Sequence, residues 1–114
     1  MSEQAIDIAH LDRYVAGDVA LRDEVLAIFE GQVERCLRLL DPDGPNEDWR
    51  SISHALKGAS RGIGAWDVGS LCEKAEKMTG TAEDLREARI AAKEAILASV
   101  EKALTEIRHL RRPG

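Results

Sequence analysis

The residues with the clearest chemical potential lie in one short run, residues 54–68, which reads HALKGASRGIGAWDV. Two kinds of chemistry are open to this run. Its inner piece, GASRGIG, resembles the glycine-rich turn that holds the pyrophosphate of a dinucleotide. Alternatively, the run is a helix on which His54 is a nucleophile and Lys57 a neighbouring cation. The elements on either side of the run decide between the two.

A dinucleotide site places strict demands on its surroundings. Its glycine turn follows a buried strand and opens a helix, so that the helix N-terminus faces the phosphates. Residues 46–57 instead read NEDWRSISHALK, a polar segment with helical periodicity and no run of β-branched residues. A short-chain dehydrogenase also has a catalytic tyrosine with a lysine four residues after it. The only tyrosine here is Tyr14, and the residue four positions later is Asp18. The sequence therefore argues against dinucleotide binding.

Read as a helix, the run has a polar face centred on His54. Four residues lie within about 60° of His54 when each residue adds about 100°; they are Lys57, Gly58, Arg61 and Ala65. The apolar residues lie on the opposite side, between about 140° and 220° from His54; they are Trp49, Ile52, Leu56, Ala59 and Ile63. We therefore expect His54 to point away from the core.

The two nearest neighbours of His54 favour phosphoryl chemistry. Lys57 lies three residues on, so its ammonium can reach an anion attached to the imidazole. Gly58 costs a helix about 1 kcal/mol relative to alanine, and its missing side chain leaves a hollow in which a large partner can approach. A neutral imidazole keeps one ring nitrogen as a lone pair for attack on phosphorus. No carboxylate cluster near His54 could hold Mg²⁺, so we expect the metal on the partner.

Length and composition indicate one helical domain over residues 1–114. Hydrophobic residues make up 44% and charged residues 32%, and no apolar run approaches the eighteen residues of a membrane span. The first residues lack the pattern of a signal peptide, so a cytoplasmic protein without a membrane partner is expected. The net charge of −5 argues against nucleic acid as a partner. Cys36 and Cys72 each fall in an apolar helical pattern and are expected to be free thiols.

Apolar residues recur every three or four positions along almost the whole chain, which predicts an all-α fold. The predicted helices cover about residues 6–16, 19–40, 47–64, 67–79 and, from the sequence TAED at 81–84, to about 110. Asp18 and Asn46 are expected N-caps, and Thr81 with Asp84 approximates a capping box. Short loops imply antiparallel neighbours, so we expect an up-down four-helix bundle with the short first helix as a lid. On the second helix, the expected seam is Leu21, Val25, Ile28 or Phe29, Val33, Cys36, Leu37 and Leu40.

The remaining polar residues are expected to have ordinary roles. Glu73 and Glu76 are interpreted as solvated charges, and His10 and His109 as solvent-facing or capping side chains. Tyr14 is expected to pack on the core at the bundle end. No two histidines have the three- or four-residue spacing of a helical metal site, so no bound metal is predicted.

Residues 54–76, HALKGASRGIGAWDVGSLCEKAE, resemble the signature of a histidine-containing phosphotransfer (HPt) domain. The resemblance depends on the spacing of His54, Leu56, Lys57, Gly58, Ser60, Gly64, Ala65, Leu71, Cys72 and Glu76. It extends over nearly the whole chain, since an HPt domain is also a helical bundle that carries its histidine on the third of five helices.

The resemblance implies a phosphorelay intermediate. His54 would take a phosphoryl group from an aspartate of one receiver domain and pass it to an aspartate of another, with Lys57 stabilising the group. Gly58 would open the surface to the receiver, and Arg61 and Ala65 are further candidate contacts. The implied partners are receiver domains of response regulators or of a hybrid histidine kinase. No cofactor is expected on this chain, and a monomer without kinase activity is expected.

Two other functions stay open. The chain could be an adaptor that binds a receiver or kinase domain through the Gly58 face without accepting phosphate. It could also be a hydrolase with His54 as general base, although the His54 helix carries no carboxylate or nucleophile beside the imidazole.

Overall fold

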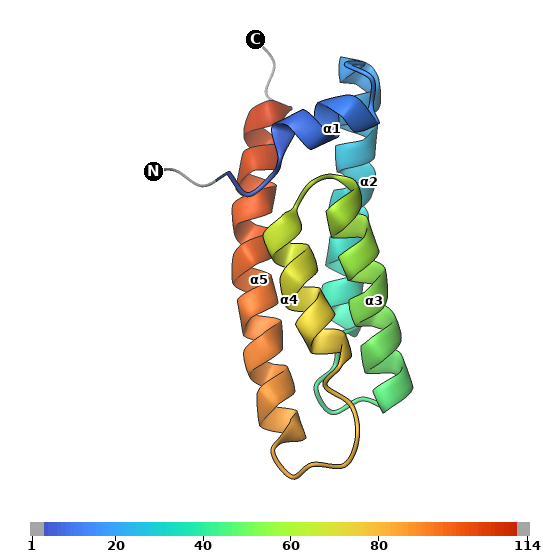
Figure 1. Cartoon of the computed structure of the whole chain (residues 1–114), viewed down its shortest axis with the longest axis vertical. Helices are drawn as coiled ribbons and strands as arrows, with labels where there is room; N and C mark the ends of the chain where they lie inside the picture. The colour runs from blue at the N-terminus through green and yellow to red at the C-terminus, as the bar shows by residue number, and fades with distance from the viewer. Residues whose placement is uncertain (1–3, 112–114) are drawn as a thin grey trace.

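The described part of the chain, residues 4–111, folds into five helices, four of which form a bundle that the first helix covers at one end (Figure 1). The computed structural model describes residues 4–111. The helices are α1 (Ile8–Tyr14), α2 (Val19–Leu39), α3 (Asn46–Gly62), α4 (Trp66–Glu76) and α5 (Leu85–Leu110). Helices α2 to α5 alternate in direction, and residues 4–111 contain no strand. The predicted all-α, up-down bundle with a short N-terminal helix is confirmed.

Each bundle helix buries one apolar stripe. The buried side chains include Leu26, Phe29, Val33, Trp49, Leu56, Val68, Cys72, Ile96, Val100, Ala103 and Ile107. Burial of each large apolar side chain contributes about 1.5–3 kcal/mol. On α2, the three-and-four spacing of Leu26, Phe29 and Val33 sets the buried stripe. Leu26 was absent from the predicted seam, whereas Leu21 and Ile28 are exposed.

The two cysteines are free thiols, as the sequence predicts. Cys72 is fully buried, and burial raises the pKa of its thiol to about 12. Cys36 is partly buried on α2, and burial raises the pKa of its thiol as well. Both side chains therefore act as small apolar groups of the core.

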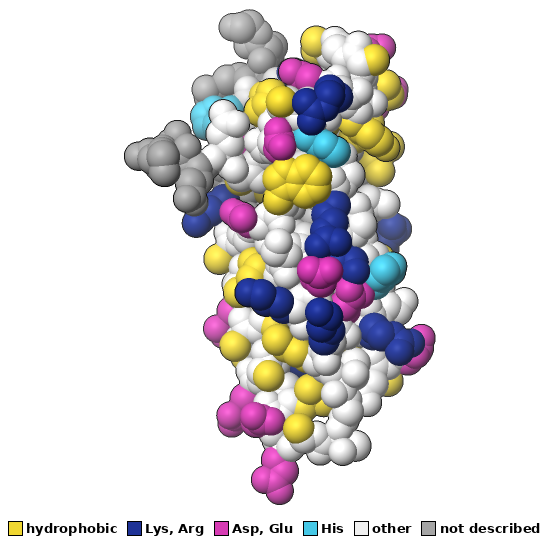
Figure 2. Space-filling model, in the orientation of Figure 1, with side chains coloured by type: hydrophobic (Ala, Val, Ile, Leu, Met, Phe, Trp, Pro, Cys, Tyr) yellow, Lys and Arg dark blue, Asp and Glu magenta, His cyan; other side chains and the backbone are white. Residues whose placement is uncertain are grey.

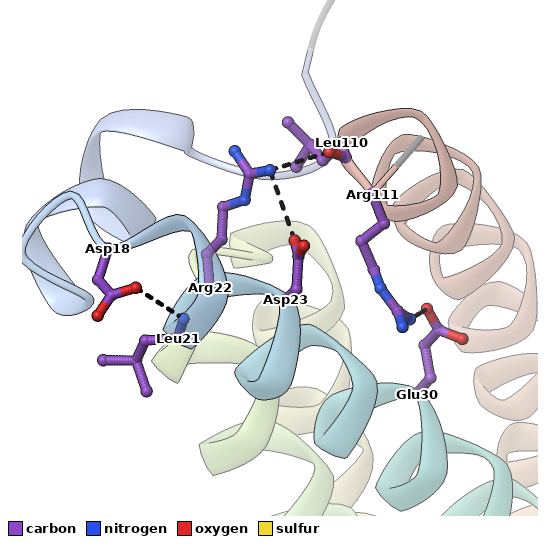
Figure 3. A network of polar contacts seen from close by, with 7 residues as sticks. All are labelled: Asp18, Leu21, Arg22, Asp23, Glu30, Leu110 and Arg111. Atoms are coloured by element: carbon purple, nitrogen blue, oxygen red, sulfur yellow. Dashed lines mark hydrogen bonds and ion pairs between the residues drawn. The ribbon is translucent and has the colours of Figure 1, made fainter. Parts of the chain in front are cut away.

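Helix α2 begins at its predicted cap. The Asp18 carboxylate accepts a hydrogen bond from the Leu21 N–H at 3.1 Å, which satisfies one of the free donors of the first turn. Nearby, Arg22 donates to the Leu110 carbonyl at 2.9 Å, and Arg111 pairs with Glu30 at 3.0 Å (Figure 3). These contacts fasten α2 to the end of α5, at its first turn through Arg22 and near its middle through Glu30.

At the other end of the bundle, the side chain of Arg89 joins two loops. The guanidinium lies 4.9 Å from the ring centre of Trp49, and the residue is only 2% exposed. Its N–H groups donate to Asn46 Oδ1 at 2.6 Å, Met78 O at 2.9 Å, Gly44 O at 3.0 Å and Pro42 O at 3.3 Å. One buried side chain on α5 thus holds the α2–α3 and α4–α5 connections together.

Two of the predicted caps are wrong. Helix α3 starts on Asn46 itself, and the Asn46 amide binds Arg89 and the Gly80 carbonyl instead of the helix end. Asp84 precedes α5 without a side-chain hydrogen bond to it, so Thr81 and Asp84 form no capping box. For Asn46 the cause is a pair of long-range contacts, because Arg89 and the Gly80 carbonyl of the neighbouring loop engage its amide.

Helix α1 is tied to the turn between α3 and α4. The Asp7 N–H donates to the Gly64 carbonyl at 2.9 Å, and Gly64 has φ +84°. A Cβ on Gly64 would lie 2.9 Å from the Asp7 carbonyl oxygen, so only glycine fits this contact. Nε2 of His10 lies 3.2 Å from the Gly62 carbonyl, which places His10 in the capping role expected of it, at the end of α3. No helix in residues 4–111 is long and apolar enough to cross a bilayer.

Candidate functional site

The side chain of His54 projects from the exposed face of α3, as the helical wheel predicts. It is 69% exposed, whereas Leu56 and Trp49 on the opposite side of the helix are buried. Figure 2 shows basic and acidic side chains interleaved on the face that α3 and α4 form together. The histidine therefore belongs to a charged surface and not to the core.

Glu76, the last residue of α4, connects the two key side chains of α3. Its Oε2 lies 2.9 Å from Nδ1 of His54, and its Oε1 accepts a hydrogen bond from Nζ of Lys57. Glu76 and Lys57 are only 15% and 16% exposed. The interpretation of Glu76 as a solvated charge is therefore wrong, because α4 packs along α3 and brings its carboxylate between the two side chains.

This arrangement lowers the pKa of Glu76 and orients the imidazole. The hydrogen bond from Lys57 is the largest cause of the lowered pKa, desolvation opposes it, and the bond with His54 adds to it. An ionised carboxylate only accepts hydrogen bonds, so the geometry assigns the proton of the neutral ring to Nδ1. Nε2 then carries the lone pair, and no polar atom of residues 4–111 bonds it. The site can therefore present a nucleophilic nitrogen to an approaching electrophile.

An open groove begins one helical turn beyond His54. A Cβ placed on Gly58 would meet nothing within 4 Å. The groove has a volume of about 270 Å³, and its lining includes Tyr14, Val25, Ile28, Gln32, Gly58 and Gly62. Tyr14 and Ile28 are each 62% exposed, so the expectation that Tyr14 packs in the core is wrong. The sequence pattern had left Ile28 and Phe29 as alternatives for the core. Phe29 is the buried residue, and the exposed Ile28 lines the groove.

A second hollow, of similar volume, lies on the other side of the histidine. It has a volume of about 260 Å³ and is lined by Glu47, Arg50, Ser51, His54 and Glu76. Arg50 lies four residues before His54 and pairs with Glu47. Polar groups therefore flank the imidazole on this side, and the apolar groove lies on the other.

Arg61 lies on the same charged face but leans onto α4. Its guanidinium is 3.3 Å from the Glu73 carboxylate, and both side chains are partly exposed. A Cβ on Gly69 would come within 2.9 Å of Arg61 Cγ, so this glycine makes room for the arginine stem. The structure thus places Arg61 where a partner can reach it, within an ion pair that joins α3 and α4.

Ala65 is the one predicted site residue that the structure removes from the surface. It is fully buried and lies between α3 and α4. The wheel extended α3 to residue 64, but the helix ends at Gly62, and the chain turns at Gly64. Because the turn rotates Ala65 into the core, its assignment as a partner contact is wrong.

The site also has a carboxylate that the hydrolase alternative was thought to lack, since Glu76 reaches His54 from α4. That carboxylate is shared with Lys57, and the Ser51 hydroxyl, which lines the same hollow, makes no hydrogen bond with His54. Within residues 4–111, no three His, Cys, Asp or Glu side chains converge as a metal site.

Comparisons with known proteins agree on one family. Residues 21–110 match the Hpt domain family. Among solved structures, the crystal structure of histidine phosphotransferase ShpA from Caulobacter crescentus is similar, with a TM-score of 0.71 and 33% sequence identity. The alignment covers 92% of this chain and 88% of that chain. No curated protein sequence matches.

Proposed function

Because this chain belongs to the Hpt domain family, we propose that it relays phosphoryl groups, accepting them on His54 from a receiver-domain aspartate and passing them to an aspartate of another receiver. The observation that carries the proposal is the state of the His54 ring. One nitrogen is engaged by Glu76, and the other is open to solvent.

The transfer needs no acid or base from this chain in its first step. Nε2 attacks the phosphorus of the aspartyl phosphate, the bond between phosphorus and the aspartate oxygen breaks, and the carboxylate leaves. The phosphoryl group carries its negative charge to the surface of α3, where the Lys57 ammonium can stabilise it. The Mg²⁺ that such transfers use is expected on the receiver.

The surface next to His54 suits a docking receiver domain. Gly58 presents no side chain, so a partner can approach the imidazole along the groove. The exposed apolar side chains of Tyr14 and Ile28 offer area for burial against the partner, and Arg61 adds charge on the opposite flank. Fold class and family support this assignment, and the individual contacts are proposals.

The test is transfer from a phosphorylated receiver domain to this protein. Label should move onto the wild type as an acid-labile adduct, and the His54→Gln variant should accept none. His109→Gln is the matched control, since His109 is also an exposed histidine on a helix. If the wild type binds the receiver but takes no label, the chain is an adaptor. If His54→Gln is labelled as fast as the wild type, another residue is the acceptor.

A further inference from the structure

The hollow beside His54 contains a cation that its present partner holds only weakly. Arg50 lies four residues before His54 on α3, and both side chains line this hollow of about 260 Å³. The Arg50 guanidinium pairs with the Glu47 carboxylate, and these side chains are 55% and 74% exposed. An ion pair so exposed to solvent contributes little to stability. Arg50 can therefore exchange Glu47 for another anion at little cost.

The direction of helical side chains brings the His54 ring over the turn that carries Arg50. Each Cα–Cβ bond of a helix tilts toward the helix N-terminus, so a side chain covers the turn before its own Cα. Residues four apart on a helix have Cβ atoms only about 5–6 Å apart. The flexible Arg50 side chain lies between Glu47 and His54 along α3, so it can turn from one to the other.

We propose that Arg50 is a second cation for the phosphoryl group on His54, and that Glu47 holds its guanidinium until the group arrives. This inference rests on the proposed function and adds two residues to it. On phosphorylation, the guanidinium would leave Glu47 and donate two N–H groups to phosphoryl oxygens, because its planar fork matches phosphate geometry. The Glu47 carboxylate would then be solvated, as most of its surface already is.

The other cations of this face leave room for a second one. Lys57 pairs with Glu76, and both side chains are largely shielded from solvent, so this pair is harder to break than the exposed pair of Arg50. Arg61 pairs across to α4 and lies about two helical turns from His54. Arg50 and Lys57 lie about one turn from His54 in opposite directions. A phosphoryl group on the ring would therefore lie between these two cations.

The first measurement needs no receiver domain. Phosphoramidate, a small phosphoryl donor, transfers its phosphoryl group to Nε2 of His54 and releases ammonia. Mass spectrometry should show one added phosphoryl group on the wild type and none on His54→Gln. The NMR signal of the Arg50 Nε–H group should shift on loading, whereas the signal of Arg86 should not. Arg86 is the matched control, because it forms an exposed pair with Asp43 outside the hollow. An unmoved Arg50 signal in the loaded protein would overturn the inference.

The second measurement is the equilibrium of label between a receiver and this protein. Arg50→Gln should shift label toward the receiver by roughly two- to fivefold, the range for an exposed ion pair. Arg86→Gln removes an arginine of similar exposure and should leave the equilibrium unchanged.

A substitution at Glu47 should have the opposite effect. Glu47→Gln frees the guanidinium in advance, so label should shift toward this protein. Asp48→Asn measures the effect of removing any carboxylate from the same turn, since Asp48 does not line the hollow. The gain of Glu47→Gln should exceed that of Asp48→Asn, and most of it should disappear when Arg50→Gln is added. A gain that survives in the double variant would show that Glu47 does not act through Arg50.

The outcomes separate this inference from the proposed function. If no receiver passes label to the wild type, the relay fails, and the phosphoramidate-loaded protein still decides whether Arg50 binds the phosphoryl group. If the wild type takes label and Arg50→Gln matches it in equilibrium, only the role of Arg50 is lost. If Arg50→Gln changes transfer but the Arg50 signal does not move on loading without a receiver, Arg50 contacts the partner, which also overturns the inference.

Discussion

Arg89 and His54 each connect neighbouring segments through side-chain nitrogen atoms. They differ in how many of their hydrogen-bonding groups have no partner within the protein. Arg89 is buried at the end of the bundle, and four of its five N–H groups donate to fixed oxygens. His54 lies in solvent, and only one of its two ring nitrogens is engaged. A buried group with its hydrogen bonds satisfied stabilises the fold, whereas an oriented group with a free lone pair can react.

The difference also shows in the partners. The Arg89 guanidinium bonds only neutral oxygens, three of them backbone carbonyls, so its contacts specify loop geometry. His54 instead shares an ionised carboxylate with Lys57, and in the proposed relay these charges would lie beside the incoming phosphoryl group. The two regions should therefore respond oppositely to mutation, one in stability and the other in transfer.

The largest expected effect is on stability at Arg89. Arg89→Met keeps most of the stem but leaves the loop carbonyls without donors, which should cost about 3 kcal/mol. For a chain of this length that corresponds to a fall in melting temperature of roughly 12 °C. Thermal unfolding followed by circular dichroism measures it. His54→Gln should change stability by less than about 0.5 kcal/mol, and equal losses in the two variants would remove the contrast.

The next effect is on transfer at Lys57. Lys57→Ala removes the cation beside the phosphoryl group and should slow transfer about tenfold, equivalent to about 1.4 kcal/mol. The melting temperature should fall less than for Arg89→Met, because the side chains of the Lys57–Glu76 pair are still 16% and 15% exposed, whereas Arg89 is only 2% exposed. Transfer assays with Lys74→Ala as control check this, since Lys74 is exposed on α4. A large fall in melting temperature without slower transfer would mean that Lys57 has a structural role, like Arg89, and not a role in transfer.

A substitution at Gly58 should separate docking from stability. Gly58→Gln fills the open start of the groove and should weaken receiver binding severalfold. It should also stabilise α3 by about 0.5 kcal/mol, because glutamine is the better helix former. Gly31→Gln on α2 gives the same gain in helix propensity at a position that also faces open space but does not line the groove. Normal receiver binding by Gly58→Gln would show that the groove is not the docking site.

The smallest effect concerns acid and helix α1. The pKa of Asp7 is lowered chiefly by the hydrogen bond from the Trp66 indole, with the His10 N–H as the next cause. Its native pKa lies below the unfolded value, so the unfolded state takes up the proton first as the pH falls. The contribution of Asp7 is present above about pH 4 and is lost as the pH falls through the native pKa.

Fluorescence of Trp66 across this range should report a loosening of α1, while the bundle itself remains folded. Asp7→Asn should lose the pH dependence. A wild-type signal that is flat between pH 5 and the acid unfolding of the whole bundle, roughly pH 2, would contradict the prediction.

Local patterns predicted the parts of the site that lie on one helix. The wheel placed His54, Lys57 and Gly58 on one exposed face because α3 is regular through all three residues. The contact with Glu76 could not be predicted in the same way, since it depends on how α4 is rotated against α3. The apolar positions of α4 put Glu76 near an edge of that helix, and only the packed pair shows which edge.

The errors at helix ends have physical causes of the same kind. Ala65 was assigned to the exposed face because the wheel was continued past the end of α3. The sequence signal that α3 ends before Ala65 was Gly64, which has a left-handed φ in the turn that follows the helix. Asn46 has the residue type of a cap, but the buried Arg89 and the Gly80 carbonyl compete for its amide. The role of such a side chain is set by partners that are distant in the sequence, and a pattern of neighbouring residues does not include those partners.

Helix α1 supplies Tyr14 to the rim of the groove, and within residues 4–111 it makes no polar contact with His54, Lys57 or Glu76. Mutations in this covering helix can therefore change which partner surfaces fit without altering the reactive ring. In the proposed docking mode, part of the surface that selects a partner would therefore be encoded in α1, so a duplicated gene could diverge toward a new partner by drift in a helix of only seven residues.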